Sequence, residues 1–170
     1  MRRIVIRLSD DLDRLCRVLA AGCFIGMLIF VTIQVVARYI LQEPPSWTEE
    51  LARFAMIWGG LLGATVAFKA HFDPVLAKPP APERRLLSIG AAVLRALAVL
   101  IFIGPVLYFS LFGTDMDPAR GFLGRSALRT ADTLGFSLAY ITAAVPLAAA
   151  VILLHLLARG LGDPGRGDPS

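Results

Sequence analysis

The sequence predicts an all-α membrane protein with four transmembrane helices and a short amphipathic interfacial helix start between the first and the second. The chain is 56% hydrophobic, and its mean hydropathy of +0.69 over 170 residues exceeds what the surface of a soluble domain tolerates. The stretches between charged residues form four apolar runs, at 18–37, 51–68, 92–113 and 134–158. Each supplies roughly the 20 residues that cross about 30 Å of hydrocarbon. Backbone inside a bilayer must form its hydrogen bonds internally, so separate runs of this length are expected to be helices.

The segment before the first run reads MRRIVIRLSDDLDRLCR. It is basic like a signal peptide, but three aspartates follow and the apolar run is too long for a cleaved signal, so we expect a retained anchor. Cys16 and Cys23 lie one heptad apart, where a disulfide between them is geometrically implausible. We expect one four-helix transmembrane domain over 1–160 and a short, disordered, cytoplasmic tail over 161–170, which is rich in Gly and Pro.

The connection between the first two runs contains two prolines, which predict a break and a new helix. Pro44 and Pro45 prevent the first helix from continuing, since proline lacks an N–H and favours an extended predecessor. Ser46 and Glu49 match a capping box, in which the serine oxygen accepts from the N3 amide and the glutamate reaches back to the cap amide. The second helix is therefore predicted to begin at Ser46.

The first turns of this second helix carry an unusual density of polar groups. Glu49 and Arg53 can pair at i,i+4, while an apolar stripe runs along another face, with Trp47 as an interfacial anchor; the stripe comprises Trp47, Leu51, Phe54 and Trp58. One interpretation is a well-capped helix start with no further role. The other is that the cluster of Glu49, Glu50 and Arg53 is exposed and forms a docking edge for another protein.

The third and fourth runs carry features that point to helix packing. Pro105 and Pro146 are expected to kink their helices. Arg95 lies near one end of the third run, where it either snorkels to the headgroups or contacts a partner helix. Small residues should allow close approach of helices, within the chain or against a partner; they include Gly22, Gly26, Gly59, Gly60 and Gly63.

Charge predicts the orientation. Of the 17 lysines and arginines, eleven lie in the N-terminal segment, the second connection and the C-terminal end, and five lie in the other two connections. The positive-inside rule then places both termini of this multi-pass protein in the cytoplasm. The basic residues follow membrane edges and form no groove-sized stripe, so we expect contact with the lipid bilayer and none with nucleic acid.

The acidic residues restrict the possible functions. All 13 lie outside the four runs, whereas a chain that moved protons or sodium by itself would need a carboxylate at depth. The sequence also contains no CxxC motif, nucleophile elbow or glycine-rich phosphate loop. We therefore expect neither an enzyme nor a self-sufficient pump.

Several residues of the first half resemble a known signature. These are Arg38-Tyr39, the stretch PSWTEELAR from Pro45 to Arg53, Trp58, Gly63-Ala64 and His71. In this pattern the chain is similar to the small membrane subunit of tripartite ATP-independent periplasmic (TRAP) transporters, the DctQ-type family. The resemblance implies a multi-pass protein of the bacterial inner membrane. It also implies four spans with the N-terminus inside, which agrees with the expectation from hydropathy and charge.

The resemblance also implies a role and partners. Such a subunit is non-catalytic and scaffolds a large multi-span subunit that is sodium-coupled and takes up an organic acid delivered by a periplasmic solute-binding protein. No cofactor is expected in this chain. Residues expected at the partner interface are Arg38, Tyr39, Trp47, Glu49, Glu50, Arg53, Trp58, Gly63 and His71.

Two other readings remain open at this stage. His71 and His155 both lie toward the same membrane face in the predicted topology. They could ligate a haem between helices, as in the membrane anchor of a respiratory complex. Alternatively, the four helices could form a small free-standing oligomer.

Overall fold

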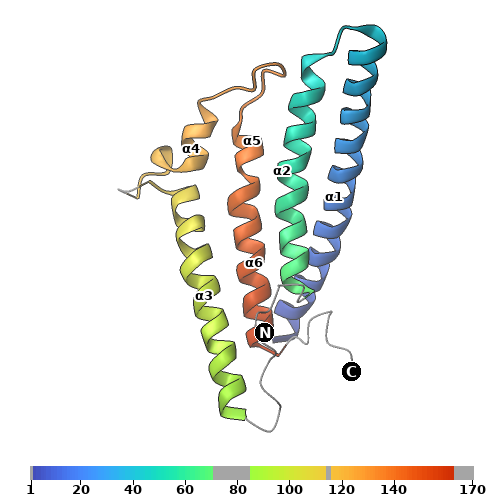
Figure 1. The fold of residues 1–170 in the computed structure, drawn as a ribbon. Coiled ribbons are helices and arrows are strands. Elements are labelled where there is room, and N and C mark those ends of the chain that lie inside the picture. The colour runs from blue at the N-terminus through green and yellow to red at the C-terminus, as the bar shows by residue number, and fades with distance from the viewer. Residues whose placement is uncertain (1, 71–84, 114–115, 163–170) are drawn as a thin grey trace.

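The computed structural model describes residues 2–70, 85–113 and 116–162, with side chains from residue 89 onward in the second range. Most of the predicted tail and His71 lie outside these residues. The described chain is helical, and its elements are α1 (Arg2–Val36), η1 (Ala37–Leu41), α2 (Ser46–Lys69), α3 (Arg85–Leu111), η2 (Pro118–Arg120), α4 (Phe122–Ala127), α5 (Ala139–Thr142) and α6 (Ala144–Gly160) (Figure 1).

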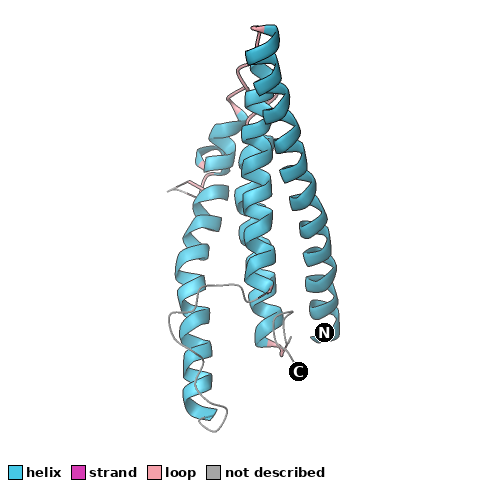
Figure 2. Cartoon of the chain, turned by 45° about the vertical axis from the view of Figure 1, so that its right-hand side comes forward, coloured by secondary structure: helices cyan, strands magenta, loops and turns pink. Residues whose placement is uncertain are grey.

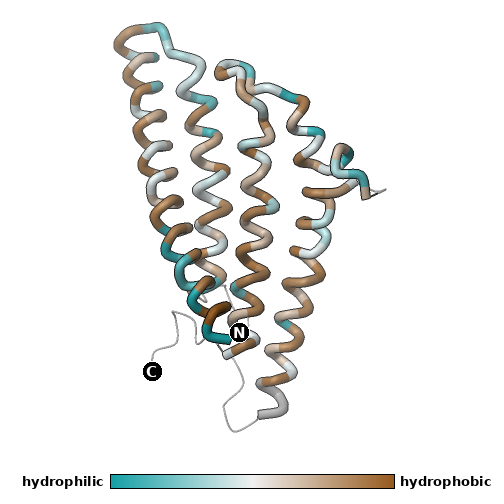
Figure 3. The backbone as a smooth tube through the Cα atoms, turned by 180° about the vertical axis from the view of Figure 1, so that it is seen from behind, coloured by the Kyte–Doolittle hydropathy of each residue, from teal (hydrophilic) through white to brown (hydrophobic). Residues whose placement is uncertain are grey.

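Four of these segments are long and apolar enough to cross a membrane, which confirms the predicted fold class. They are Arg2–Leu41, Ser46–Lys69, Ile89–Leu111 and Ala139–Gly160. The first differs most from the prediction, because the helix begins about sixteen residues before the apolar run. Its 40 residues span about 60 Å, roughly twice the hydrocarbon thickness. The hydropathy colouring shows that hydrophilic residues alternate with hydrophobic ones in its N-terminal turns (Figure 3).

The extra turns of α1 are helical because they have a face to bury. Ser9, Asp13, Cys16 and Ala20 recur at spacings of four, three and four, and all are buried. Cys16 and Ala20 form a core cluster with Leu62 of α2 and Val151 of α6, and Trp58 and Val66 pack against it. Both cysteines are free thiols.

The helices α1 and α2 form an antiparallel hairpin, and α6 packs against both of them. The approach is closest at Gly59, where a Cβ would lie 3.2 Å from Cβ of Cys23. Among the residues that the structure describes, the other glycines expected to support close packing do not meet a neighbouring helix closely. A Cβ at Gly22, Gly60 or Gly63 would meet no atom within 4 Å, so a side chain there would be accommodated.

The helix α3 is peripheral, and among the described elements it packs against α6 and α4. It also extends past the ends of α1 and α6, whereas the α1–α2 hairpin extends farthest at the opposite end (Figures 1 and 2). Pro105 lies inside α3 without ending it. Near Pro146 the helix is interrupted, because α5 ends at Thr142 and α6 begins at Ala144, and Pro146 has no N–H to donate to the Thr142 carbonyl.

The two ends of the bundle are formed by different parts of the chain. At one end Nε of Arg2 donates to the Leu161 carbonyl oxygen at 2.6 Å, so the beginning of α1 and the end of α6 meet. We call this the N-terminal end, and the tip of the α1–α2 pair the hairpin end. Four crossings place both described ends of the chain on one side of the membrane.

Candidate partner interface

The hairpin end is built by the break that the two prolines impose. After η1 the chain reverses through Gln42, whose positive φ of 57° permits the sharp exit, and α2 begins at Ser46. Tyr39, Ile40 and Leu41 are 78%, 73% and 67% exposed. The tip therefore presents large apolar side chains in a place where the predicted topology puts the outer surface of the membrane.

The start of α2 is stabilised differently from the predicted capping box, which is wrong. Pro45 is the last residue with extended backbone, at φ −71° and ψ 128°, so Ser46 is already helical and makes no cap hydrogen bond. Instead, the Thr48 hydroxyl donates to the Pro45 carbonyl oxygen at 2.7 Å, and Thr48 is fully buried. The Glu49 carboxylate accepts from Arg53 at 3.2 Å rather than reaching back to the cap.

Glu50 is the residue for which the prediction of an exposed cluster fails. It is only 8% exposed, and its carboxylate accepts three backbone N–H groups of the α4–α5 loop. Oε1 accepts from Asp132 at 3.0 Å, and Oε2 accepts from Thr133 at 3.0 Å and from Leu134 at 3.2 Å. A carboxylate is suited to this role because it offers about four acceptor sites and no donor. Glu50 therefore holds the loop onto the start of α2.

Aromatic contacts reinforce the same end. The Phe54 ring of α2 lies 5.6 Å from the Phe136 ring of the α4–α5 loop, centroid to centroid, so this contact also holds the loop against α2. Trp47 packs edge-to-face on Phe30 of α1 at 6.4 Å while remaining 39% exposed. The hairpin end is thus a braced surface, in which α1, α2 and the α4–α5 loop are joined by specific contacts.

The predicted interface residues separate into two groups. Arg38, Tyr39, Trp47, Glu49 and Arg53 are exposed and lie at the hairpin end. The remaining described members lie elsewhere or face inward.

Trp58 packs against the core, about 16 Å from Trp47 along α2. Gly63 lies about 24 Å from Trp47 along the same helix, and a Cβ there would have no close neighbour. Glu50 faces into the protein, and His71 lies outside the described residues. Hydropathy could not reveal the partners of Glu50, because they are backbone amides more than 80 positions away.

A second polar cluster, at the N-terminal end, escaped prediction. Nζ of Lys69 donates to Oγ of Ser9 at 2.8 Å and to Oδ1 of Asp10 at 2.7 Å. Oγ of Ser9 is also hydrogen-bonded to Nδ1 of His155 at 2.8 Å. Ser9, Lys69 and His155 are all under 7% exposed, so this network joins α1, α2 and α6 through buried side chains. The available signal was the presence of Lys69 and His155 near the ends of apolar runs.

Arg159 closes this end from α6. Its guanidinium donates to the Phe68 carbonyl oxygen at 2.7 Å, a C-terminal carbonyl of α2, and it stacks over the Phe68 ring at 4.7 Å. Terminal helix carbonyls lack partners within their own helix, so a cation there satisfies one of them. Among residues 2–70, 85–113 and 116–162, no three His, Cys, Asp or Glu side chains are grouped so that they could hold a metal ion.

Together these features define a class of protein, a small polytopic membrane protein. The acidic side chains described within its spans lie near helix ends, in Arg2–Asp13 of α1 and in the first turn of α2. The comparison with known proteins narrows it. The family model for tripartite ATP-independent periplasmic transporters, DctQ component, matches residues 27–163, and the chain belongs to this family.

A curated relative agrees with this placement. The sialic acid TRAP transporter small permease protein SiaQ of Vibrio cholerae serotype O1 is 25% identical over 134 residues, which are 78% of this chain and 71% of the relative. The chain is therefore a TRAP transporter small permease component and not an enzyme. The haem-anchor and free-standing alternatives are not favoured.

Proposed function

We propose that this subunit scaffolds a large, sodium-coupled membrane subunit in the bacterial inner membrane, for uptake of an organic acid delivered by a periplasmic solute-binding protein. The observation that carries the proposal is the braced hairpin end. It presents Tyr39, Ile40 and Leu41 to the outside, while Glu50 holds the α4–α5 loop against the start of α2. An exposed apolar surface on a rigid support is suited to binding another protein.

Three further observations support this assignment. The acidic side chains described within the spans lie near helix ends, so a coupling ion would bind elsewhere in the assembly. Arg2, Lys69 and Arg159 gather at the N-terminal end, which favours cytoplasmic termini. The similar protein from Vibrio cholerae is named for sialic acid, and an organic acid of that kind is the substrate class that we propose here.

Within this proposal, the exposed residues at the hairpin end contact the partner subunit or the binding protein. Arg38, Tyr39 and Trp47 would supply the cationic and aromatic contacts that commonly dominate protein interfaces. Glu49 and Arg53, paired at 3.2 Å and more than half exposed, would supply charge at the rim. Glu50 acts indirectly, by positioning the loop.

The test is co-purification of the tagged full chain, expressed with its neighbouring genes and solubilised in mild detergent. We expect a stoichiometric multi-span membrane protein, identified by mass spectrometry. We expect Tyr39→Ala to lower its recovery about tenfold, the effect of losing an aromatic anchor of about 1.4 kcal/mol.

Phe102→Ala is the matched control, because Phe102 is a similarly exposed aromatic residue, at 72%, within α3 and away from the hairpin end. Equal losses in both variants would argue against an interface at the hairpin end. Recovery of this chain alone, as a defined oligomer, would contradict the scaffold assignment itself.

A further inference from the structure

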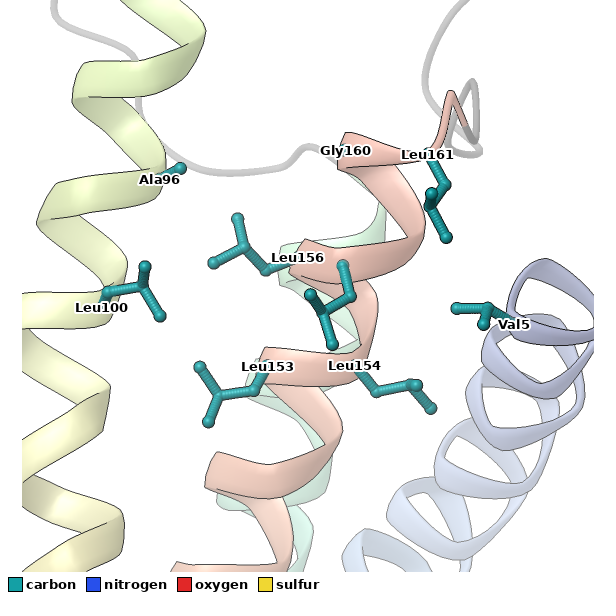
Figure 4. Close-up of a pocket in the computed structure, with 9 residues that line it drawn as sticks. Val5, Ala96, Leu100, Leu153, Leu154, Leu156, Gly160 and Leu161 are labelled. Atoms are coloured by element: carbon teal, nitrogen blue, oxygen red, sulfur yellow. The ribbon is translucent and has the colours of Figure 1, made fainter. Parts of the chain in front are cut away.

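A groove runs along α6 at the N-terminal end, between α3 and the first turns of α1. Its apolar part has a volume of about 610 Å³, within the range of ligand pockets. Leu153, Leu154 and Leu156 of α6 project between Ala96 and Leu100 on α3 and Val5 on α1 (Figure 4). The groove lies beside the contact between α3 and α6. It is open because no other described element packs against the far side of α3 at this end.

A basic cavity of about 300 Å³ adjoins this apolar groove. Ala96, Leu156 and Gly160 line both, so the two cavities meet along these three residues. The smaller cavity adds Arg95 of α3 and Arg159 of α6. None of the described lining residues is acidic.

The lengths of the spans predict that both arginines lie near the depth of lipid headgroups. Arg95 is exposed, and its Nε donates to the Ala91 carbonyl oxygen at 3.3 Å, so the side chain runs back toward the N-terminal end of α3, the direction in which a snorkelling arginine points. Arg159 lies about 30 Å along α5 and α6 from Ala139, which is one hydrocarbon thickness. Arg2 lies nearby, bonded to the carbonyl of Leu161, which also lines the groove.

We propose that this groove binds one anionic phospholipid, with its acyl chains along the α6 leucines and its phosphate at Arg95 and Arg159. Guanidinium groups match phosphate oxygens in geometry and charge, and basic pockets between transmembrane helices bind anionic headgroups. Charge complementarity selects this occupant over a second protein, because an apolar trough with a cationic mouth matches the two parts of a phospholipid. The bound lipid would support α3 on the side where the described protein leaves it uncovered.

This inference goes beyond the scaffold role and does not rest on it. The test uses the full chain, together with any subunit that co-purifies, in vesicles containing phosphatidylglycerol with a photoactivatable acyl chain. Phosphatidylcholine with the same acyl chain is the comparison lipid. After illumination, mass spectrometry maps the labelled peptides.

We expect phosphatidylglycerol to label α3 and α6 peptides around the groove about 25-fold more than phosphatidylcholine, about fivefold for each of the two arginines near the membrane surface. Arg95→Gln should lower that difference to about fivefold, whereas Arg53→Gln at the hairpin end should preserve it. Ala96→Trp should abolish labelling by filling the groove. Leu94→Trp is its matched control, since Leu94 is 69% exposed on α3 and does not line the groove.

Several results would overturn the proposal. Equal labelling by the two lipids, or labelling unchanged in Arg95→Gln, would show that the groove has no preference for an anionic headgroup. Full competition by inorganic phosphate would indicate a free-anion site instead. Disulfide cross-linking of an Ala96→Cys variant to the large subunit would show that protein fills the groove. Arg95→Gln keeps the test decisive if Ala96→Trp fails to fold, because Arg95 is at the surface.

Discussion

Replacing Glu50 with glutamine should release the α4–α5 loop from the start of α2. The carboxylate accepts three backbone N–H groups at 3.0, 3.0 and 3.2 Å, and a hydrogen bond to a charged group contributes about 1.5–3 kcal/mol. Glutamine keeps one carbonyl oxygen but turns an NH₂ group toward a donor, so at least one bond is lost. Water reaches the exposed Asp132 and Thr133 and replaces part of that loss. We expect local opening to become easier by about 2 kcal/mol.

The assay is hydrogen exchange of amides 132–134 in the full chain, followed by mass spectrometry. A change of about 2 kcal/mol corresponds to roughly 30-fold faster exchange. Glu49→Gln is the matched control, because Glu49 forms an exposed ion pair with Arg53 that contributes at most about 0.5 kcal/mol, about twofold. If both variants exchanged at the same rate, or if these amides were already unprotected in the native chain, the clamp assigned to Glu50 would be refuted.

Two further substitutions test the packing of α1. Gly59→Val should lower the free energy of unfolding in detergent by about 1–3 kcal/mol, because its Cβ would press on Cys23 at 3.2 Å. Gly60→Val is the control and should be neutral, because a Cβ at Gly60 would meet no described atom within 4 Å. Equal melting temperatures for the two variants would contradict the close approach at Gly59. Ser9→Ala should cost about 1–3 kcal/mol by breaking the buried bonds to Lys69 and His155. Ser46→Ala, which removes no cap bond, should leave the melting temperature unchanged, and a loss as large as that of Ser9→Ala would contradict the assigned start of α2.

The four spans were predictable because lipid imposes a simple requirement on sequence. Any segment that crosses it must be apolar for about 20 residues and must bond its own backbone. The break at Pro44 and Pro45 was equally local, since proline affects only its own turn and its predecessor. The family resemblance also rested on short stretches within residues 38–71, of which the longest runs from Pro45 to Arg53, and the match over residues 27–163 agrees with it.

Local patterns were misleading where a side chain had a distant partner. Glu50 and Glu49 are neighbours of the same type, yet one is clamped inside the protein and the other is exposed beside Arg53. Ser46 matched a cap motif, but the helix begins at Ser46 as predicted with Pro45 in the cap position, so the serine side chain makes no cap hydrogen bond. A glycine pattern marks where helices can approach, but it cannot say which glycine is used. Of Gly59, Gly60 and Gly63 in α2, only Gly59 lies close to the described residues of α1.

The sequence by itself determined how often the chain crosses the membrane, where its main hairpin turns and to which family it belongs, because hydropathy, proline geometry and a contiguous motif are properties of short stretches. The tertiary structure alone decided which polar side chains are buried together. Ser9, Lys69 and His155 come from three helices, and Glu50 reaches backbone groups more than 80 residues away. Burial of such groups is stabilising only when every partner is in place, and that condition depends on how the helices pack against one another.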